Sequence, residues 1–229
     1  RRLATMAANP SVKSIMIKAL YLQFFFGGLV SLLVITNPLS KIPLFVSLTQ
    51  GMSELRRAHQ ARMACVYAAA IMLVSLLAGN VILGAFGISY GALRIAGGFV
   101  VATLGYRMLF LSQDPGMAPS TKRREDYSFF PLAMPGISGP GTIAVVIGMA
   151  TEIAELDNHT ARLLALGMTT LAIFATCAGI FLLLRSAGWI AQRIGRAGTE
   201  VLGRLMGFLL ICVGVQFIGS GIRTFMAGS

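Results

Sequence analysis

Asn37-Pro38-Leu39-Ser40-Lys41-Ile42-Pro43 and Pro135-Gly136-Ile137-Ser138-Gly139-Pro140-Gly141 are two stretches of this chain with the same arrangement of residues. Each places two prolines five positions apart, with a serine between them, inside a long apolar run. Proline removes a backbone donor and clashes with the carbonyl four residues earlier, so a pair of prolines should kink or unwind a helix. The two stretches therefore predict two broken helices.

The composition indicates a membrane protein. Of the 229 residues, 56% are hydrophobic and 12% are charged, and the mean hydropathy is +0.78, whereas an average globular domain has about 25% charged residues. The formal net charge of +11 would suggest nucleic-acid binding in a soluble protein. Here the basic residues cluster between apolar runs, as they do in cytoplasmic loops, so we do not expect nucleic acid as a partner.

Six apolar runs are long enough to cross a bilayer, which takes about 20 residues as a helix. They cover residues 20–50, 62–86, 88–111, 129–151, 161–184 and 203–226. We therefore predict an all-α polytopic membrane protein of six transmembrane helices, in which helices 1 and 4 are broken.

The chain repeats itself across its two halves. Pro38 and Pro135 are 97 residues apart, and the motif G-F-x5-G occurs at both Gly98 and Gly207. Three spans in each half would force the halves into opposite orientations, which is the inverted-repeat plan of many transporters. The predicted units are a basic N-terminal tail (1–18), transmembrane repeat 1 (19–111), a basic cytoplasmic loop (112–128) and transmembrane repeat 2 (129–229).

The connections alternate in charge. Segments 51–62, 107–128 and 185–204 are rich in arginine and lysine, whereas 86–91 is uncharged and 152–160 is acidic. Because positive loops face the cytoplasm, this pattern predicts that both termini are periplasmic. The basic N-terminal tail argues for the opposite orientation.

The broken helices suit a solute that carries both charges. Asn37-Pro38 and Gly139-Pro140 are helix-start signals, and Pro43 falls too early for a continuous helix, so we expect a half-helix, an unwound piece and a second half-helix. Helix N-termini carry a partial positive charge of roughly half a unit and suit a carboxylate. The carbonyls at broken C-termini suit an ammonium group or a cation. An amino acid is such a solute, although the prolines could instead only kink packed helices.

The candidate substrate-binding residues are those of the two breaks: Asn37, Pro38, Ser40, Pro43, Pro135, Ser138, Gly139, Pro140, Gly141 and Thr142. Two basic residues are candidates to line the entrance to the site or to bind a charged group of the solute. Lys41 lies between the first pair of prolines, and its alternative role is to snorkel to an interface. Arg94 lies near the start of the third span, and its alternative role is to mark the membrane interface. No acidic residue lies well inside any predicted span.

Catalytic and metal-site signatures are missing from the sequence. His59 and His159 stand alone, and Cys65, Cys177 and Cys212 lie in apolar runs where they would pack as small hydrophobes. We therefore expect no enzyme activity, no metal and no cofactor. A coupling ion, Na⁺ or H⁺, is left open.

Four stretches resemble the MarC family, and specifically the member that gives it its name: NPLSKIPLFVSLT (37–49), FGISYGALRIAGGFVVATLGYRMLF (86–110), FFPLAMPGISGPGTIAVVI (129–147) and RLMGFLLICVGVQFIGSGI (204–222). The resemblance covers residues 20–225. It implies a six-span protein of the bacterial inner membrane, related to the LysE-type exporters. Some relatives are described as small neutral amino acid transporters, and the family name reflects an association with antibiotic resistance.

Three functions remain open on the sequence. A secondary transporter of small neutral amino acids predicts a small midplane cavity lined by Asn37, Ser40, Ser138 and Thr142. A multidrug exporter predicts a larger, aromatic or methionine-rich cavity with acidic residues. A non-transporting membrane partner protein predicts that the breaks are packed shut. The expected partners are the lipid bilayer and a small solute, and the oligomeric state is left open.

Overall fold

The computed structural model describes residues 21–110 and 126–227, and this part of the chain is helical with no strand. The elements follow in the order η1 (Tyr21–Gly27), α3 (Gly28–Thr36), α4 (Pro38–Leu48), α5 (Glu54–Ala85), α6 (Tyr90–Phe110), η3 (Ser128–Ile137), α7 (Pro140–Ala154), α8 (His159–Arg185) and α9 (Ala187–Ala227). The stretch η1 is π-helical, whereas η3 is irregular, with extended backbone at Phe130 and Met134. The predicted N-terminal tail and most of the predicted 112–128 loop lie outside the described residues.

Four described helices are long and apolar enough to cross a membrane, and two bent pairs pass the same test together. The pair Leu22–Thr36 and Pro38–Val46 is bent by 42°, and the pair Ser128–Ile137 and Pro140–Ala154 is bent by 60°. If each bent pair is one span, the described chain has six spans, and the broken ones are the first and fourth. The all-α membrane fold is therefore confirmed, whereas the inverted repeat stays a prediction.

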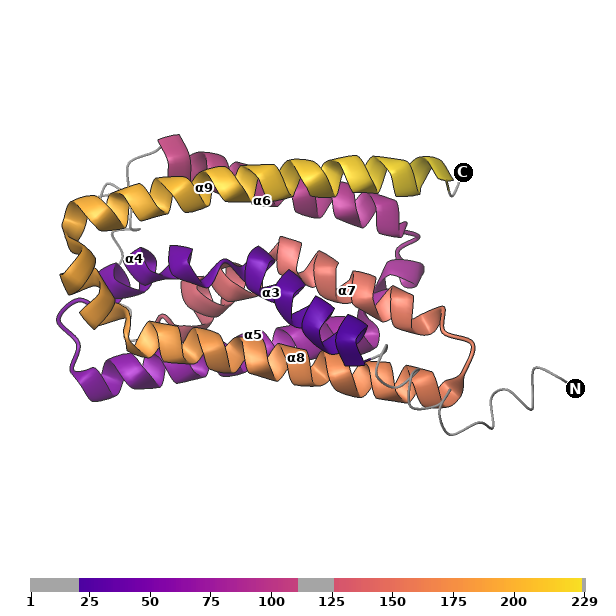
Figure 1. Cartoon of the computed structure of the whole chain (residues 1–229), viewed down its shortest axis with the longest axis horizontal. Coiled ribbons are helices and arrows are strands. Elements are labelled where there is room, and N and C mark those ends of the chain that lie inside the picture. Colours follow the sequence, from indigo (N-terminus) through magenta and orange to yellow (C-terminus); the bar gives the residue numbers. More distant parts are fainter. Residues whose placement is uncertain (1–20, 111–125, 228–229) are drawn as a thin grey trace, which may run out of the picture.

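The helices form three layers (Figure 1). Helices α6 and α9 pack together on one side and α5 and α8 on the other, with the broken helices between them. The main core lies where α5 and α8 meet the middle layer, and Leu32, Met72, Leu132 and Ile173 are among its fully buried side chains. The broken spans are thus held on both sides by unbroken ones.

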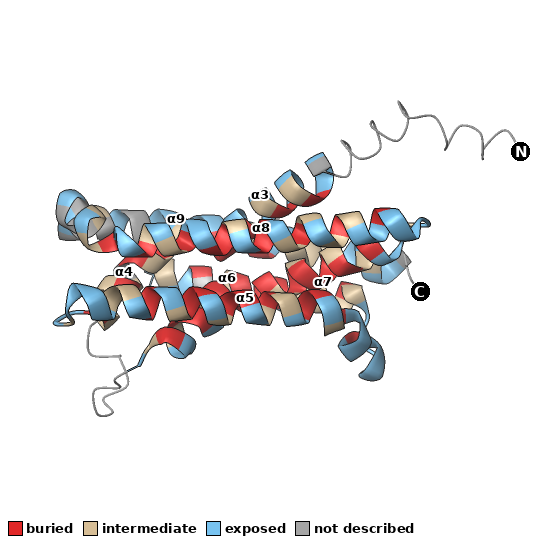
Figure 2. Ribbon diagram, turned by 90° about the horizontal axis from the view of Figure 1, so that it is seen from below, coloured by how far each residue is buried: buried red, intermediate tan, exposed pale blue. Residues whose placement is uncertain are grey.

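The outward faces of the long helices are apolar. In Figure 2, α5 and α8 are buried where they face the interior and exposed on the opposite side. Leu77 of α5 is 65% exposed and Leu182 of α8 is 62% exposed. A helix that is hydrophobic all round belongs in a large core or a membrane, so these outward faces are suited to lipid.

Glycines bring α6 and α9 into close contact. A β-carbon at Gly98 would lie 2.6 Å from the carbonyl oxygen of Gly214, and one at Gly105 would lie 2.5 Å from that of Gly207. The repeated G-F-x5-G motifs therefore contact each other in antiparallel order. Small residues allow membrane helices to approach this closely, and the resulting van der Waals contact holds them together.

Two expectations about local structure were wrong. The first break does not lie between Pro38 and Pro43, because α4 runs continuously through both prolines. Instead α3 ends at Asn37, whose backbone is left-handed with φ 42°, a conformation that asparagine tolerates better than most residues. Because proline has no N–H, Pro43 removes one helical hydrogen bond, the one to the Leu39 carbonyl. The loss is small because it falls next to the first turn of α4, where the N–H groups have no helical partner in any case.

The second wrong expectation concerns 185–204, which is not a loop but the first part of α9. The sequence there has alanine, arginine, glutamine, glutamate and leucine, which favour helix, among four glycines, which do not. Arg204 pairs with Glu200 one turn away at 2.7 Å. The helix kinks at Gly195, where φ is 71°, a value that glycine adopts without steric cost.

We expect the C-terminus to be periplasmic. The end of α9 and the base-poor α5–α6 and α7–α8 connections lie at one end of the bundle, and the α4–α5 connection in the base-rich 51–62 segment lies at the other (Figure 1). Reporter enzymes fused after Ser229 will test this, with one reporter active only in the cytoplasm and the other only in the periplasm. Activity of the cytoplasmic reporter alone would contradict the orientation.

Gly98→Ala should destabilise the α6–α9 contact, because the new methyl group would meet backbone atoms that cannot move aside. Overpacking of this kind costs about 1–3 kcal/mol. The control is Gly219→Ala on α9, where a β-carbon would meet nothing within 4 Å. SDS titration of the purified protein in mixed micelles measures the free energy of unfolding. Equal losses in the two variants would show that the glycine contact contributes nothing particular.

Candidate functional site

The two breaks lie against each other. A β-carbon at Gly141, in the first turn of α7, would lie 3.3 Å from Cδ1 of Ile35, in the last turn of α3. The same position contacts Val101 of α6. The structure therefore brings together the two segments that carry the matched prolines, midway along the bundle (Figure 1).

At both breaks, side-chain hydroxyl groups donate hydrogen bonds to backbone carbonyls. Ser40 Oγ donates to the carbonyl of Asn37 at 2.7 Å, and Thr142 Oγ1 donates to that of Ile137 at 3.0 Å. Ser138 Oγ donates to the carbonyl of Ala68 on α5 at 2.9 Å. These three side chains are buried, so their hydroxyls have a structural role at the breaks.

The other predicted site residues surround the same point. Asn37, Gly139 and Gly141 are buried, and Pro38, Lys41 and Pro140 are half-buried, whereas Pro135 is exposed. The backbone of Pro43 lies in α4, and its side chain is outside the described residues. Whether any of these residues contacts a solute stays a prediction.

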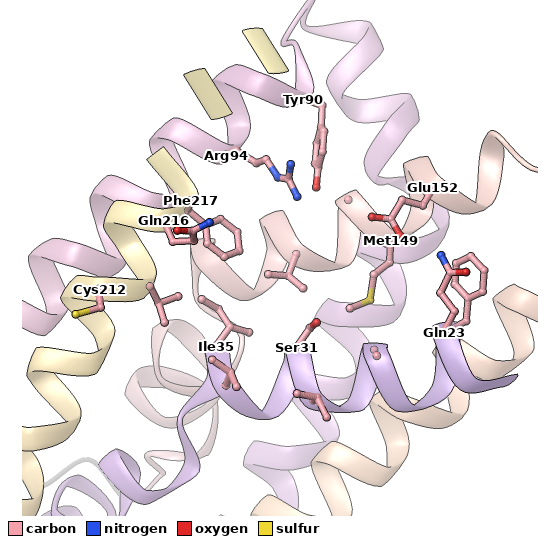
Figure 3. Close-up of a pocket in the computed structure, with 18 residues that line it drawn as sticks. Gln23, Ser31, Ile35, Tyr90, Arg94, Met149, Glu152, Cys212, Gln216 and Phe217 are labelled. Atoms are coloured by element: carbon pink, nitrogen blue, oxygen red, sulfur yellow. The ribbon is translucent and has the colours of Figure 1, made fainter. Parts of the chain in front are cut away.

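A cavity of about 690 Å³ lies beside the breaks, on the α3 and α7 side (Figure 3). Its walls come from η1, α3, α6, α7 and α9. The lining residues are Gln23, Phe24, Gly27, Gly28, Val30, Ser31, Val34, Ile35, Tyr90, Arg94, Val145, Gly148, Met149, Glu152, Cys212, Val213, Gln216 and Phe217. The set includes Arg94 but none of the ten residues predicted at the breaks, so this cavity is not the one that the sequence predicted.

Arg94 projects from α6 into this cavity (Figure 3). Its guanidinium carbon lies 4.7 Å from the centre of the Tyr90 ring, one helical turn earlier. Its Nε is buried and has no hydrogen-bond partner among residues 21–110 and 126–227, and an unsatisfied buried donor costs about 1–3 kcal/mol. Arg204, which precedes the second copy of the glycine motif, is instead exposed and paired with Glu200.

Glu152 faces the same cavity from α7 (Figure 3). It is close enough to Arg94 for their charges to interact, yet these two described side chains form no ion pair. One turn earlier on α7, Gly148 leaves room for the hydroxyl of Tyr90, which a β-carbon would overlap. The face of α6 that carries Tyr90 and Arg94 therefore packs against the face of α7 that carries Gly148 and Glu152.

Sequence reasoning missed Glu152 because it assigned residues 152–160 to a connection. The structure continues α7 to Ala154, so the carboxylate lies on the last turn of a broken span. The spacing of four between Gly148 and Glu152, which places them on one helix face, was the signal available in the sequence.

The rest of the lining is mixed. Gln23, Ser31 and Gln216 bring polar groups from the first and last spans, and Phe24 and Phe217 bring aromatic rings. Among the described residues, no group of three or more His, Cys, Asp or Glu side chains could hold a metal ion. The site is thus an apolar cavity with one basic and one acidic side chain on facing walls.

Comparison with known proteins places this chain in a family. A sequence model described as "MarC family integral membrane protein" matches residues 22–226. The chain belongs to the MarC family. It is 42% identical over 204 residues to the inner membrane protein MarC of Escherichia coli O1:K1, covering 85% of this chain and 92% of that protein. The MarC proteins of Escherichia coli K12 and Shigella flexneri are 41% identical over the same length and coverage.

No solved structure matches the chain. The resemblance seen in the sequence is confirmed, and this MarC-family protein is an integral protein of the inner membrane. The names of the relatives state a family and a location, and no solute.

Ser138→Ala should destabilise the protein by about 1 kcal/mol, the typical net value of one hydrogen bond, because it cuts a bond between the second break and α5. Ser75→Ala is the control, since Ser75 is also buried but donates to Ile71 within its own helix. SDS titration measures both changes. If Ser75→Ala costs as much as Ser138→Ala, the bond to Ala68 does not anchor the break.

Proposed function

We propose that this MarC-family protein is a secondary transporter of small zwitterions, such as neutral amino acids. One observation carries the proposal: Arg94 and Glu152 face a single cavity beside the two broken spans, without forming an ion pair. A solute with one positive and one negative group would complement both side chains. An uncharged solute would leave both charges without a partner.

The chemistry of the cavity supports this class of solute. Arg94 is half-buried and Glu152 is exposed. Because opposite charges attract and like charges repel, a cavity with one charge of each sign disfavours ligands of a single sign. Ligand sites are typically apolar cavities of roughly 300–1,000 Å³ with a few polar groups. The cavity here, at about 690 Å³ and with Gln23, Ser31 and Gln216 among its polar lining, fits that description.

The position of the cavity supports movement of the solute as opposed to a static role. Two of its walls, α3 and α7, are halves of broken spans and meet their other halves at angles of 42° and 60°. Discontinuous helices form the solute sites of many transporters, in which one part of the protein rocks against the other around the site. The buried, hydrogen-bonded hydroxyls at the breaks fit a non-transporting partner protein, and the cavity beside the breaks is what favours transport.

A multidrug exporter is the second candidate, favoured by a different part of the lining. Phe24, Phe217 and Met149 give the cavity the aromatic and thioether surface that binds varied apolar molecules, and Glu152 could attract a cation. Arg94 opposes this function, because it would repel a cationic drug from the same space.

Uptake into proteoliposomes tests the proposal. The purified protein should accumulate labelled alanine, glycine or leucine under a Na⁺ or H⁺ gradient, and excess unlabelled amino acid should reduce uptake of the label. Protein-free liposomes are the control. Absence of amino acid uptake under every gradient would reject the proposed substrate class, and uptake of a lipophilic cation in its place would favour the exporter.

The breaks themselves are tested with four variants in the same assay. Asn37→Ala and Ser138→Ala should weaken uptake, since each removes a compact polar side chain worth roughly 1 kcal/mol. Pro140→Ala should weaken it by letting helix form across the second break. Pro43→Ala should weaken it less, because α4 is already continuous through Pro43. Wild-type rates in all four folded variants would exclude the breaks from the transport mechanism.

A further inference from the structure

We propose that the cavity binds an α-amino acid in one orientation, with its carboxylate on Arg94, its ammonium group on Glu152 and its side chain against Phe24, Met149 and Phe217. This inference rests on the proposed function and deepens it by assigning each end of the solute to a residue. It also extends the substrate class from the smallest neutral amino acids to those with larger apolar side chains.

Arg94 is built to receive a carboxylate. Its guanidinium presents donors in a planar fork that matches the two oxygens of a carboxylate. The Nε of Arg94 is buried without a partner among the described residues, so one donor of the fork is already removed from water. The Tyr90 ring lies over the guanidinium carbon at 4.7 Å, and the Tyr90 hydroxyl rests against Gly148 of α7. The arginine is therefore held between two helices.

Glu152 is placed to receive the ammonium group. It lies four residues after Gly148 on the same helix, and Arg94 lies four residues after Tyr90 on the facing helix. The contact between Tyr90 and Gly148 thus fixes both ends of the site relative to each other. The two charges interact but form no ion pair, which leaves each of them able to bind one end of a zwitterion.

The remaining space is suited to an apolar side chain. Phe24 comes from η1, Met149 from α7 and Phe217 from α9, so the apolar surface surrounds the charged pair from three elements. A volume of about 690 Å³ is in the range that holds drug-sized ligands and exceeds what glycine or alanine would fill. Each methylene that a longer side chain buries strengthens binding.

Single-sign ligands fit this cavity poorly. A simple anion on Arg94 would face the carboxylate of Glu152, and a simple amine on Glu152 would face the guanidinium of Arg94. The same argument excludes lysine- and glutamate-like side chains in the apolar part, where a third charge would have no partner.

Binding of labelled leucine to the purified protein tests the orientation, with two competitors that each lack one charge. These are 4-methylpentanoate, which has no ammonium group, and 3-methylbutylamine, which has no carboxylate. Each should compete about tenfold or more weakly than leucine, since a hydrogen bond to a charged group is worth at least that factor. Leucine and methionine should compete more strongly than glycine, and the reverse order would overturn the placement of the side chain.

Charge variants then assign the two ends. Arg94→Gln should weaken leucine and 4-methylpentanoate about tenfold or more and leave 3-methylbutylamine unchanged or stronger. Glu152→Gln should weaken leucine and 3-methylbutylamine and leave 4-methylpentanoate unchanged or stronger. Arg223→Gln and Asp157→Asn are matched controls, because neither residue lines the cavity and neither is among the charges that act on Glu152.

The outcomes separate the two proposals. Equal weakening of all three compounds by either charge variant, or the same pattern in a control variant, overturns the orientation even if the wild type transports amino acids. If leucine binds with the expected pattern but is not transported, the orientation stands and the proposed transport function fails. Size-exclusion profiles and melting temperatures in detergent confirm that each variant is folded. Arg94→Lys keeps the positive charge but loses the planar guanidinium, so it should retain part of the affinity for leucine.

Discussion

The constraint behind this architecture is that every backbone group at bilayer depth needs a partner. A helix satisfies its own groups, but a break releases them in the middle of the protein. Here the Ile137 carbonyl at the second break accepts the hydroxyl of Thr142, and Ser138 ties that break to α5. At the first break the Asn37 carbonyl accepts both the N–H and the hydroxyl of Ser40. The chain thus supplies hydroxyls beside its prolines and places intact helices on both sides of the broken ones.

The two outer layers are held together in different ways. Glycines allow α6 and α9 to touch along their backbones at Gly98, Gly105, Gly207 and Gly214. In contrast, α5 and α8 contribute buried side chains such as Met72 and Ile173 to the main core. A close backbone contact leaves little freedom for sliding, so α6 and α9 form a firm frame. Arg94 is carried by this frame, and Glu152 is carried by the second half of a broken span.

Much of the fold was predictable from sequence because it depends on local rules. Apolar run length gave the spans, and the proline pairs marked the two spans that bend, although the first bend lies at Asn37, just before its pair. The details of the first break were not predictable, because whether Asn37 caps the next helix or ends the previous one is decided by packing around Ile35 and Gly141.

The cavity was largely missed for a related reason. Its lining comes from five elements that are distant in sequence, and of the candidate site residues only Arg94 is part of it.

The two charged residues of the cavity lie on different kinds of element, Arg94 on the unbroken α6 and Glu152 on the second half of a broken span. If α7 tilts at Gly139, Glu152 moves relative to Arg94, because Glu152 lies near the far end of α7 and the displacement grows with distance from the break. The contact between Tyr90 and Gly148 limits this motion, since the tyrosine hydroxyl fills the space that glycine leaves. A solute bridging Arg94 and Glu152 would favour the arrangement in which both charges are within reach. Binding of a solute in the cavity and the angle between η3 and α7 would therefore influence each other, because both depend on the contact between α6 and α7.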